Sequence, residues 1–333
     1  MNPCGERRAK EVTDEPFAQK ELSFNGTICM KIGFSSLVCP GWDLPTIVEQ
    51  ASNLGFQGVE LRGLRGELHL PLVPELSGRP ERVRGLFAEK KVELVCLGTS
   101  ASLSSKDKNE IARQKGVIVE FMELASRLDC PFVRVFAGEF DRRDTPERAI
   151  VRMAEALRSL ATTASRLNVT LLVENGGDFV GSQALWFLMD AVSHPAVQCC
   201  WNQCNAMTIL ERPTISVPRL GCRIGLVHVC DADFDDAGVL QGYKLPGEGD
   251  VGVSRQIELL RGVVQRGYLM FEWPKLWVET LPGPEAVLPK VAEFLKNCLS
   301  SKQAVLSAYK GDKNAPKYAG GAVAPAVSQT SLP

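Results

Sequence analysis

Short apolar segments alternate with longer amphipathic segments between about residue 30 and residue 298. Several of the short segments are apolar at nearly every position, which is typical of parallel strands covered on both faces. The longer segments repeat apolar residues at helical spacing. This alternation predicts an α/β fold in which crossover helices join parallel strands. The predicted strands cover residues 30–35, 58–62, 92–98, 132–137, 170–175, 197–202, 224–231 and 268–273.

The predicted helices cover residues 44–54, 79–90, 109–128, 146–167, 182–192, 253–266 and 284–299. Asp107 and Thr145 suit N-cap positions, and Pro146 suits the first turn of a helix. Eight strand and helix units between residues 30 and 298 match a (β/α)8 TIM barrel, which typically takes about 250 residues. We therefore predict one barrel domain over residues 29–300. Residues 1–28 and 301–333 lack periodicity and are predicted to be flexible tails, the second of low complexity.

An open, doubly wound sheet is the alternative fold. Such a sheet binds its ligand where the strand order reverses, and for nucleotides it uses a glycine-rich loop after the first strand. The first predicted strand instead ends in Gly33-Phe34-Ser35-Ser36, which lacks the spacing of that loop. The barrel is therefore the favoured prediction.

Composition and charge exclude several classes of protein. The 333 residues are 45% hydrophobic and 23% charged, which is ordinary for a globular chain. The net charge of −1 creates no overall field that would attract nucleic acid or an anionic membrane. No apolar run reaches the roughly 18 residues of a membrane span, and the eleven cysteines lie in apolar stretches, as reduced thiols do. We expect a cytoplasmic protein without nucleic-acid or membrane partners.

Polar residues stand at the carboxyl ends of four otherwise apolar strands: Glu174, Asn202, His228 and Glu272. In a barrel these ends meet at one mouth, where the reactive groups lie. Each residue taken singly is more often a packed or ion-paired group. Together they indicate a site, because buried carboxylates without partners are costly. Their oxygen and nitrogen donors form a set suited to one Mn²⁺, Mg²⁺, Co²⁺ or Zn²⁺ ion.

Six further residues are candidates for substrate binding: Arg62, Asn205, Asp231, Lys244, Trp273 and Trp277. The two cationic side chains could hold a phosphate, a carboxylate or a sugar hydroxyl, although such residues on loops are more often surface charges. The tryptophans could stack on a sugar ring, or they could simply pack. The acidic residues at 233, 235 and 236 are predicted to lie on a solvated loop.

At these residues the chain resembles the xylose isomerase-like barrel superfamily, and within it the sugar phosphate isomerase/epimerase branch. The resemblance extends over residues 30–298. It is carried by GVELRG at 58–63, VCLG at 95–98, VEN at 173–175 followed by Asp178 and Phe179, CWN at 200–202, VHVCD at 227–231, GEGD at 247–250, and FEW at 271–273 followed by Trp277.

The resemblance implies that Glu174, Asn202, His228 and Glu272 hold one divalent metal ion and that the two glutamates are catalytic. In epimerases of this type the glutamates exchange a proton with the carbon beside a metal-polarised carbonyl, one from each face. The leading prediction is therefore a metal-dependent isomerase or epimerase whose small-molecule substrate is a sugar or keto-sugar.

This chain departs from the family pattern at four positions around the same mouth. Relatives usually carry Asp in place of Asn202 and His in place of Asn205, and the most similar branch has His in place of Gly176 and Val278. Asn202 keeps an oxygen donor but removes a negative charge, so we expect it to hold a cation more weakly. Asn205 can still form a hydrogen bond to a substrate hydroxyl.

Other functions compete with this prediction. A dehydratase, or a lyase that cleaves a C-glycoside of a keto-sugar, would use the same metal site and the same proton abstraction. A barrel that has lost turnover and binds a sugar or a partner protein would explain the missing polar groups. An abasic-site endonuclease is disfavoured, because it needs three zinc ions and this chain has only three histidines. The sequence leaves a homo-oligomer open.

Overall fold

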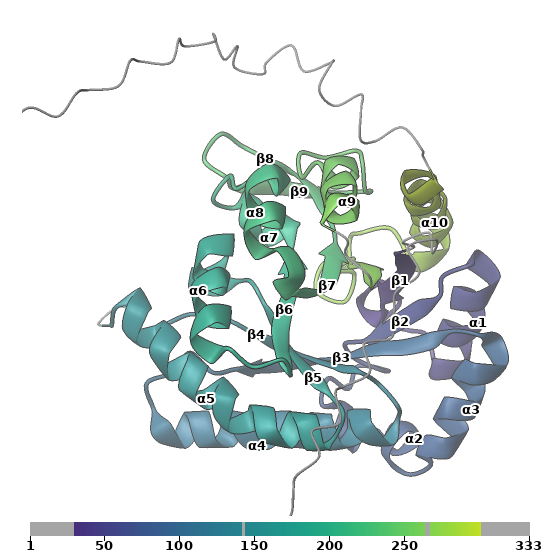
Figure 1. The fold of residues 1–333 in the computed structure, drawn as a ribbon. Helices are drawn as coiled ribbons and strands as arrows, with labels where there is room; N and C mark the ends of the chain where they lie inside the picture. Colours follow the sequence, from purple (N-terminus) through teal and green to yellow (C-terminus); the bar gives the residue numbers. More distant parts are fainter. Residues whose placement is uncertain (1–29, 142–143, 264–266, 301–333) are drawn as a thin grey trace, which may run out of the picture.

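Eight parallel strands close into a barrel in the computed structural model, which describes residues 30–141, 144–263 and 267–300 (Figure 1). The strands are hydrogen-bonded in the order β1, β10, β7, β6, β5, β4, β3, β2, and β2 pairs with β1 to close the ring. The predicted (β/α)8 barrel is thereby confirmed. The barrel strands are β1 Lys31–Ser35, β2 Gly58–Leu61, β3 Glu93–Ser102, β4 Phe132–Phe136, β5 Thr170–Glu174, β6 Val197–Asn202, β7 Ile224–Val229 and β10 Tyr268–Phe271.

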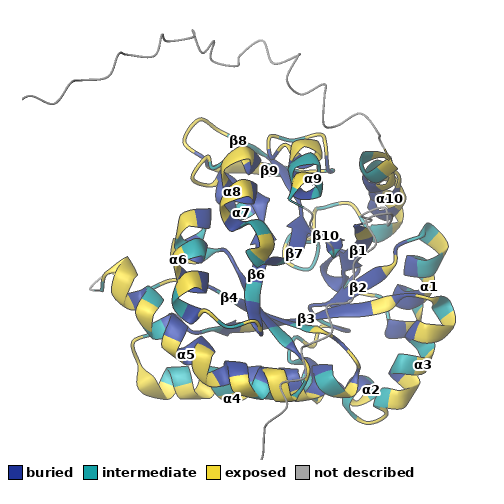
Figure 2. Ribbon diagram, viewed as in Figure 1, coloured by how far each residue is buried: buried dark blue, intermediate teal, exposed yellow. Residues whose placement is uncertain are grey.

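Helices surround the barrel, with buried inner faces and exposed outer faces (Figure 2). They are α1 Leu44–Leu54, α2 Pro74–Ser77, α3 Pro80–Lys90, α4 Lys108–Arg127, α5 Pro146–Arg166, α6 Ser182–Val192, α7 Gln203–Met207, α8 Pro213–Leu220, α9 Val253–Gly262 and α10 Pro284–Ser300. Short 3-10 turns lie at η1 Ser36–Val38, η2 Leu70–Leu72, η3 Gly177–Phe179 and η4 Gly221–Arg223. The side chains of Asp107 and Thr145 cap α4 and α5 as predicted. No helix in the described ranges is long and apolar enough to cross a membrane.

The interior of the barrel has an apolar layer and a polar layer. Alternate residues of a strand share one face, so each polar residue at a strand end stands above an apolar residue two positions earlier. The pairs are Leu172 with Glu174, Leu226 with His228, and Met270 with Glu272. These apolar residues belong to a small buried cluster, separate from the large core between strands and helices. The apolar layer thus forms a floor beneath the polar side chains at the mouth.

The structure corrects the prediction at the seventh barrel strand. The predicted strand 224–231 is interrupted after Val229, and β8 Asp231–Phe234 pairs antiparallel with β9 Leu240–Lys244. A hairpin therefore includes the residues predicted on a solvated loop: Asp233 lies on β8, and Asp235 and Asp236 lie in the exposed turn between the two strands. Asp235 closes the hairpin, because its Oδ1 accepts hydrogen bonds from the backbone N–H groups of Ala237 and Val239. The short helices α7 and α8 were also not predicted.

The predicted tails, 1–28 and 301–333, lie outside the described residues, as do residues 264–266 at the end of a predicted helix.

Candidate functional site

His228 is the centre of a buried polar cluster at the barrel mouth. Its Nε2 lies 2.8 Å from Glu60 Oε2, and its Nδ1 lies 2.9 Å from Glu174 Oε1 and 3.6 Å from Glu272 Oε1. Burial alone would lower the pKa of His228, but the surrounding Cys200, Glu60 and Glu174 raise it well above its usual value. The imidazole is therefore fixed between carboxylates that come from three different strands or strand ends.

Asn202 joins the two predicted catalytic carboxylates. Its Nδ2 donates to Glu174 Oε1 at 3.1 Å and to Glu272 Oε2 at 2.8 Å. Its Oδ1 accepts from the backbone N–H of Cys204 at 3.1 Å and so caps α7. The amide nitrogen, not the oxygen, consequently faces the carboxylates.

Arg134 on β4 pairs with Glu174 beneath the mouth. Its Nε lies 3.1 Å from Glu174 Oε2, and one of its terminal nitrogens donates to the Thr99 carbonyl at 2.8 Å. Burial opposes ionisation of Glu174, but His228 and Arg134 together lower its pKa to about 2. For Glu272 burial dominates and raises the pKa to about 7. The two glutamates therefore sit in clearly different environments, as paired acid and base groups often do.

The sequence analysis assigned no role to three members of this cluster: Glu60, Arg134 and Cys200. Glu60 also accepts from Ser35 Oγ at 3.1 Å. Cys200 lies two residues before Asn202 on β6, and burial raises the pKa of its thiol to about 12. One sequence signal could have identified Glu60 and Arg134. Each is a charged residue within an otherwise apolar strand.

The donor set of this cluster fits a divalent cation. Ligand atoms of Glu174, Cys200 and His228 lie within 4.8 Å of one another, the one such group of acidic, His and Cys side chains within the described ranges. Glu174 Oε2 is buried and makes no hydrogen bond beside its ion pair with Arg134, so it keeps a lone pair for a ligand. Two carboxylates and an imidazole suit such an ion. Asn202 would become an oxygen ligand only if its amide turned over and released Cys204.

Three of the predicted substrate contacts lie close to the mouth. Arg62 follows β2 directly, and its guanidinium lies 5.8 Å from the ring centre of the exposed Trp277. Asn205 donates from Nδ2 to the Asn175 carbonyl at 2.8 Å. A Cβ on Gly176 would lie 3.8 Å from the same nitrogen, so positions 176 and 205 face each other.

The other three predicted contacts have partners away from His228. The carboxylate of Asp231 accepts from the backbone N–H groups of residues 247, 249 and 251. Lys244 Nζ lies 3.0 Å from Asp233 on the hairpin. Trp273 is buried and donates from Nε1 to the Pro282 carbonyl. The side-chain contacts named for these three residues are thus with groups outside the cluster.

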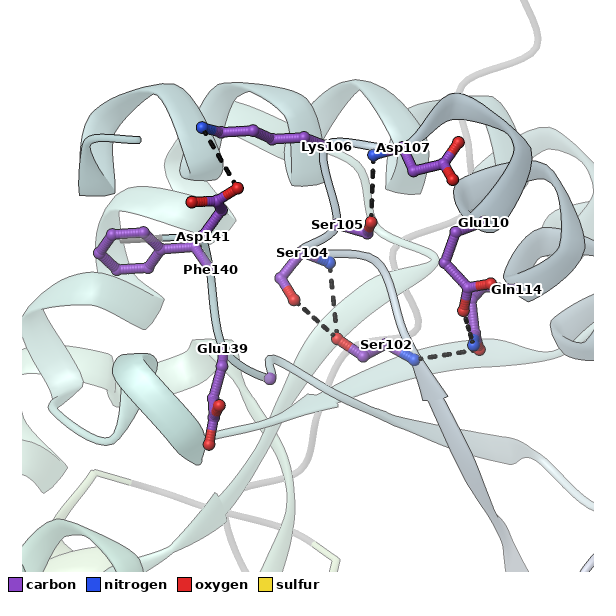
Figure 3. Close-up of a pocket in the computed structure, with 11 residues that line it drawn as sticks. Ser102, Ser104, Ser105, Lys106, Asp107, Glu110, Gln114, Glu139, Phe140 and Asp141 are labelled. Atoms are coloured by element: carbon purple, nitrogen blue, oxygen red, sulfur yellow. Dashed lines mark hydrogen bonds and ion pairs between the residues drawn. The ribbon is translucent and has the colours of Figure 1, made fainter. Parts of the chain in front are cut away.

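A hollow of about 700 Å³ lies beside the cluster, at the carboxyl ends of β3 and β4 (Figure 3). The residues that line the hollow are mostly polar and include Ser102, Ser104, Lys106 and Glu139. None of the predicted site residues is among them. Ser102 Oγ donates to the carbonyl of Ala137, whose N–H donates to the carbonyl of Glu174. The hollow therefore borders the cluster without containing it.

Comparisons with known proteins agree with this architecture. The family model described as xylose isomerase-like TIM barrel matches residues 48–298. No curated protein sequence matches the chain.

Similar solved structures include sugar-modifying enzymes. The 3-keto-D-glucoside 4-epimerase of E. coli has a TM-score of 0.66 at 14% identity, over 81% of this chain and 100% of that one. A probable 3-DHS dehydratase of Bacillus anthracis has a TM-score of 0.66 at 18% identity, over 80% and 99%. The D-psicose 3-epimerase of Clostridium cellulolyticum has a TM-score of 0.65 at 18% identity, over 82% and 100%. At these identities the likeness establishes the fold alone.

Proposed function

The chain belongs to the xylose isomerase-like TIM barrel family, and from that membership we propose that it is a sugar-modifying enzyme, a divalent-metal-dependent isomerase or epimerase of a sugar or keto-sugar. The observation that carries the proposal is the pair of carboxylates, Glu174 and Glu272, that face each other across Asn202 beside His228. Two carboxylates placed in this way can reach a substrate carbon from two sides, which is what inversion of that carbon requires.

The neighbouring side chains hold these carboxylates in place. Glu60 bonds one nitrogen of His228 and so directs the other nitrogen toward Glu174. Arg134 holds the far side of Glu174. Asn202 sets the separation of the two glutamates, and its own oxygen is fixed by the start of α7. The acid and base are therefore oriented before any substrate arrives, which lowers the cost of reaching the reactive geometry.

Glu174, Glu272 and His228 are the residues that would hold the metal ion, and Asn202 would be a weaker fourth ligand once its amide had turned its oxygen away from Cys204. When bound, such an ion acts as a Lewis acid on the substrate carbonyl and makes the adjacent C–H more acidic. One glutamate of this chain would accept the proton from one face of the carbon, and the other glutamate, in its protonated form, would donate a proton to the opposite face.

Two alternatives share parts of this site. A dehydratase or a keto-sugar lyase would begin with the same proton abstraction by a glutamate and would differ in the group that leaves. A non-catalytic barrel that binds a sugar or a partner is favoured by one observation, namely that the Asn202 amide already satisfies both glutamates by hydrogen bonds.

Hydrogen exchange at carbon separates the catalytic from the non-catalytic proposals. The protein is incubated in D₂O with ketohexoses, sugar acids and 3-keto-glycosides in the presence of Mn²⁺, Mg²⁺, Co²⁺ or Zn²⁺, and products are analysed by NMR. We expect deuterium at the carbon beside the carbonyl, lost in Glu174→Gln and in Glu272→Gln. Glu139→Gln, in the neighbouring hollow, is the matched control and should retain exchange.

The products also separate the reactions. A stereoisomer identifies an epimerase, a shifted carbonyl identifies an isomerase, and loss of water or of an aglycone identifies an elimination. Absence of exchange with all four metals, together with sugar binding that survives both glutamate substitutions, would reject the enzyme and support the non-catalytic barrel.

A further inference from the structure

Arg62 is a buried cation that forms no close ion pair within the described residues. The residue is only 4% exposed, and it forms no ion pair with any residue in the described parts of the chain. One terminal nitrogen, Nη2, donates to Ser100 Oγ at 2.7 Å, whereas Nη1 is buried and has no hydrogen-bond partner. An unpaired buried charge is expensive, so the fold retains this guanidinium at a cost unless something else pairs with it.

The residues around Arg62 leave space for its side chain and fix its backbone. A Cβ on Gly98 would lie 2.8 Å from Arg62 Cδ and 3.0 Å from Arg134 Nη2, so the missing side chain makes room for two guanidinium groups. The Arg62 backbone N–H is fixed by Ser36 Oγ at 3.0 Å. Burial and the charge of Arg134 lower the pKa of Arg62 to about 10, although the charges of Glu60, Glu272 and Glu174 act in the opposite direction, and the group stays charged at neutral pH. Two like charges thus lie close together, and only Arg134 has a carboxylate against it, that of Glu174.

The guanidinium of Arg62 lies near the surface of the mouth. Its hydrogen-bond partner Ser100 is exposed, and Trp277, against which it stacks, is 54% exposed. Arg134, by contrast, is enclosed on all sides by the barrel. The two side chains that contact the guanidinium, Ser100 and Trp277, are therefore open to solvent, and a ligand would reach the buried Nη1 only by displacing them.

The charges at the mouth leave room for an anion. The carboxyl groups of Glu60, Glu174 and Glu272 lie near two guanidinium groups, those of Arg134 and Arg62. A divalent cation held by this cluster gives the mouth a positive excess. An anionic group on the substrate would remove that excess and would pair with the one guanidinium of this cluster that has no carboxylate against it.

We propose that Arg62 binds an anionic oxygen group of the substrate through Nη1, so that the substrate is a sugar acid or a sugar phosphate and not a neutral sugar. This inference rests on the proposed function and specifies its substrate class. The carboxylate and the phosphate share the same chemistry toward a guanidinium, which forms charge-assisted hydrogen bonds with both.

The test compares binding of three probes that differ at one carbon: D-glucose, D-glucuronate and D-glucose 6-phosphate. Dissociation constants are measured by calorimetry at fixed ionic strength, with and without Mn²⁺. We expect one of the two anionic probes to bind at least roughly tenfold more tightly than glucose. The stronger of the two identifies a carboxylate or a phosphate as the partner.

Variants of Arg62 connect this preference to the residue. Arg62→Gln should abolish the preference, so that the anionic probes bind no more tightly than glucose, and Arg62→Lys should keep part of it because the charge remains. Arg166→Gln removes an exposed arginine at the end of α5, beside the amino end of β5 and so at the opposite end of the barrel from the mouth, and serves as the control. Thermal unfolding of each variant reports whether it folds.

The inference and the proposed function fail in different ways. Equal binding of all three probes, binding of neither anion, or equal weakening of glucose and of the anions in Arg62→Gln would each overturn the role of Arg62. Deuterium exchange on neutral ketohexoses that persists in Arg62→Gln would overturn it as well, while leaving the proposed isomerase or epimerase intact.

Discussion

Replacing Asn202 by Asp should make the stability of this protein depend on a metal ion. The amide nitrogen of Asn202 donates to Glu174 and to Glu272 at 3.1 and 2.8 Å. The aspartate of the Asn202→Asp variant would retain an oxygen for the backbone N–H of Cys204, because Asp is as good an N-cap as Asn. Its second oxygen would then face the carboxylates of Glu174 and Glu272, which in the wild-type protein accept hydrogen bonds from the Asn202 amide.

The magnitude follows from those two contacts. A hydrogen bond to a charged group contributes about 1.5–3 kcal/mol, so losing both removes roughly 3–6 kcal/mol from the metal-free protein. Repulsion between the carboxylates adds to this loss, and uptake of a proton by the cluster offsets part of it. A net destabilisation of about 3 kcal/mol is therefore expected without metal. With metal the added negative charge should tighten binding and restore stability by mass action.

The assay is urea denaturation of wild-type protein and Asn202→Asp, each with EDTA and with excess Mn²⁺. Asn109→Asp adds the same charge on the exposed first turn of α4 and controls for the change in net charge. Equal stability of wild type and variant in EDTA would show that the amide nitrogen does not face the two glutamates. An unchanged Mn²⁺ affinity would show that residue 202 is not a metal ligand.

Three further substitutions test other parts of the site. Gly98→Ala should destabilise the protein by about 1–3 kcal/mol in urea denaturation, because its Cβ would overlap Arg62; an unchanged midpoint would contradict the close approach. Glu60→Gln should weaken metal binding roughly 10–100-fold by leaving His228 less well oriented, as measured by metal titration, and full affinity would exclude that positioning role. Asp231→Ala should speed amide hydrogen exchange at residues 247, 249 and 251, whose N–H groups donate to its carboxylate, and unaltered protection there would show that other contacts hold this loop.

The barrel strands could be predicted because each is buried on both faces and reads as a continuous apolar run. The hairpin of β8 and β9 could not be predicted in this way, since β9 is mostly exposed and its residues, LQGYK, show no apolar pattern. Its formation depends on local hydrogen bonds to Asp235. The five-residue α7 is too short to display a helical period, and it begins directly after the last residue of β6, whose side chain caps it.

Glu174, Asn202, His228 and Glu272 could be found because a parallel barrel places all strand ends at one mouth. Glu60 and Arg134 were given no role because their partners, His228 and Glu174, lie far from them in sequence. Glu60 lies 168 residues from His228 in sequence, and only the closed order of the strands brings the two side chains together. The orientation of the Asn202 amide could not be predicted either, since the sequence shows that the residue is uncharged but not whether its nitrogen or its oxygen faces the glutamates.

Two features make the mouth more positive. Asn202 carries no negative charge, and the positive charge of Arg62 has no ion-pair partner within the described residues. An Asp at position 202 would contribute a further carboxylate, whereas Asn202 donates hydrogen bonds to the carboxylates already present. The close ion pair of Glu174 is with Arg134 and not with Arg62. Both features make the mouth more positive than that of a barrel with three carboxylate ligands and one histidine would be. A mouth of this kind is poorly suited to hold a cation by itself and better suited to hold one together with an anionic substrate, so metal and substrate should bind with positive cooperativity.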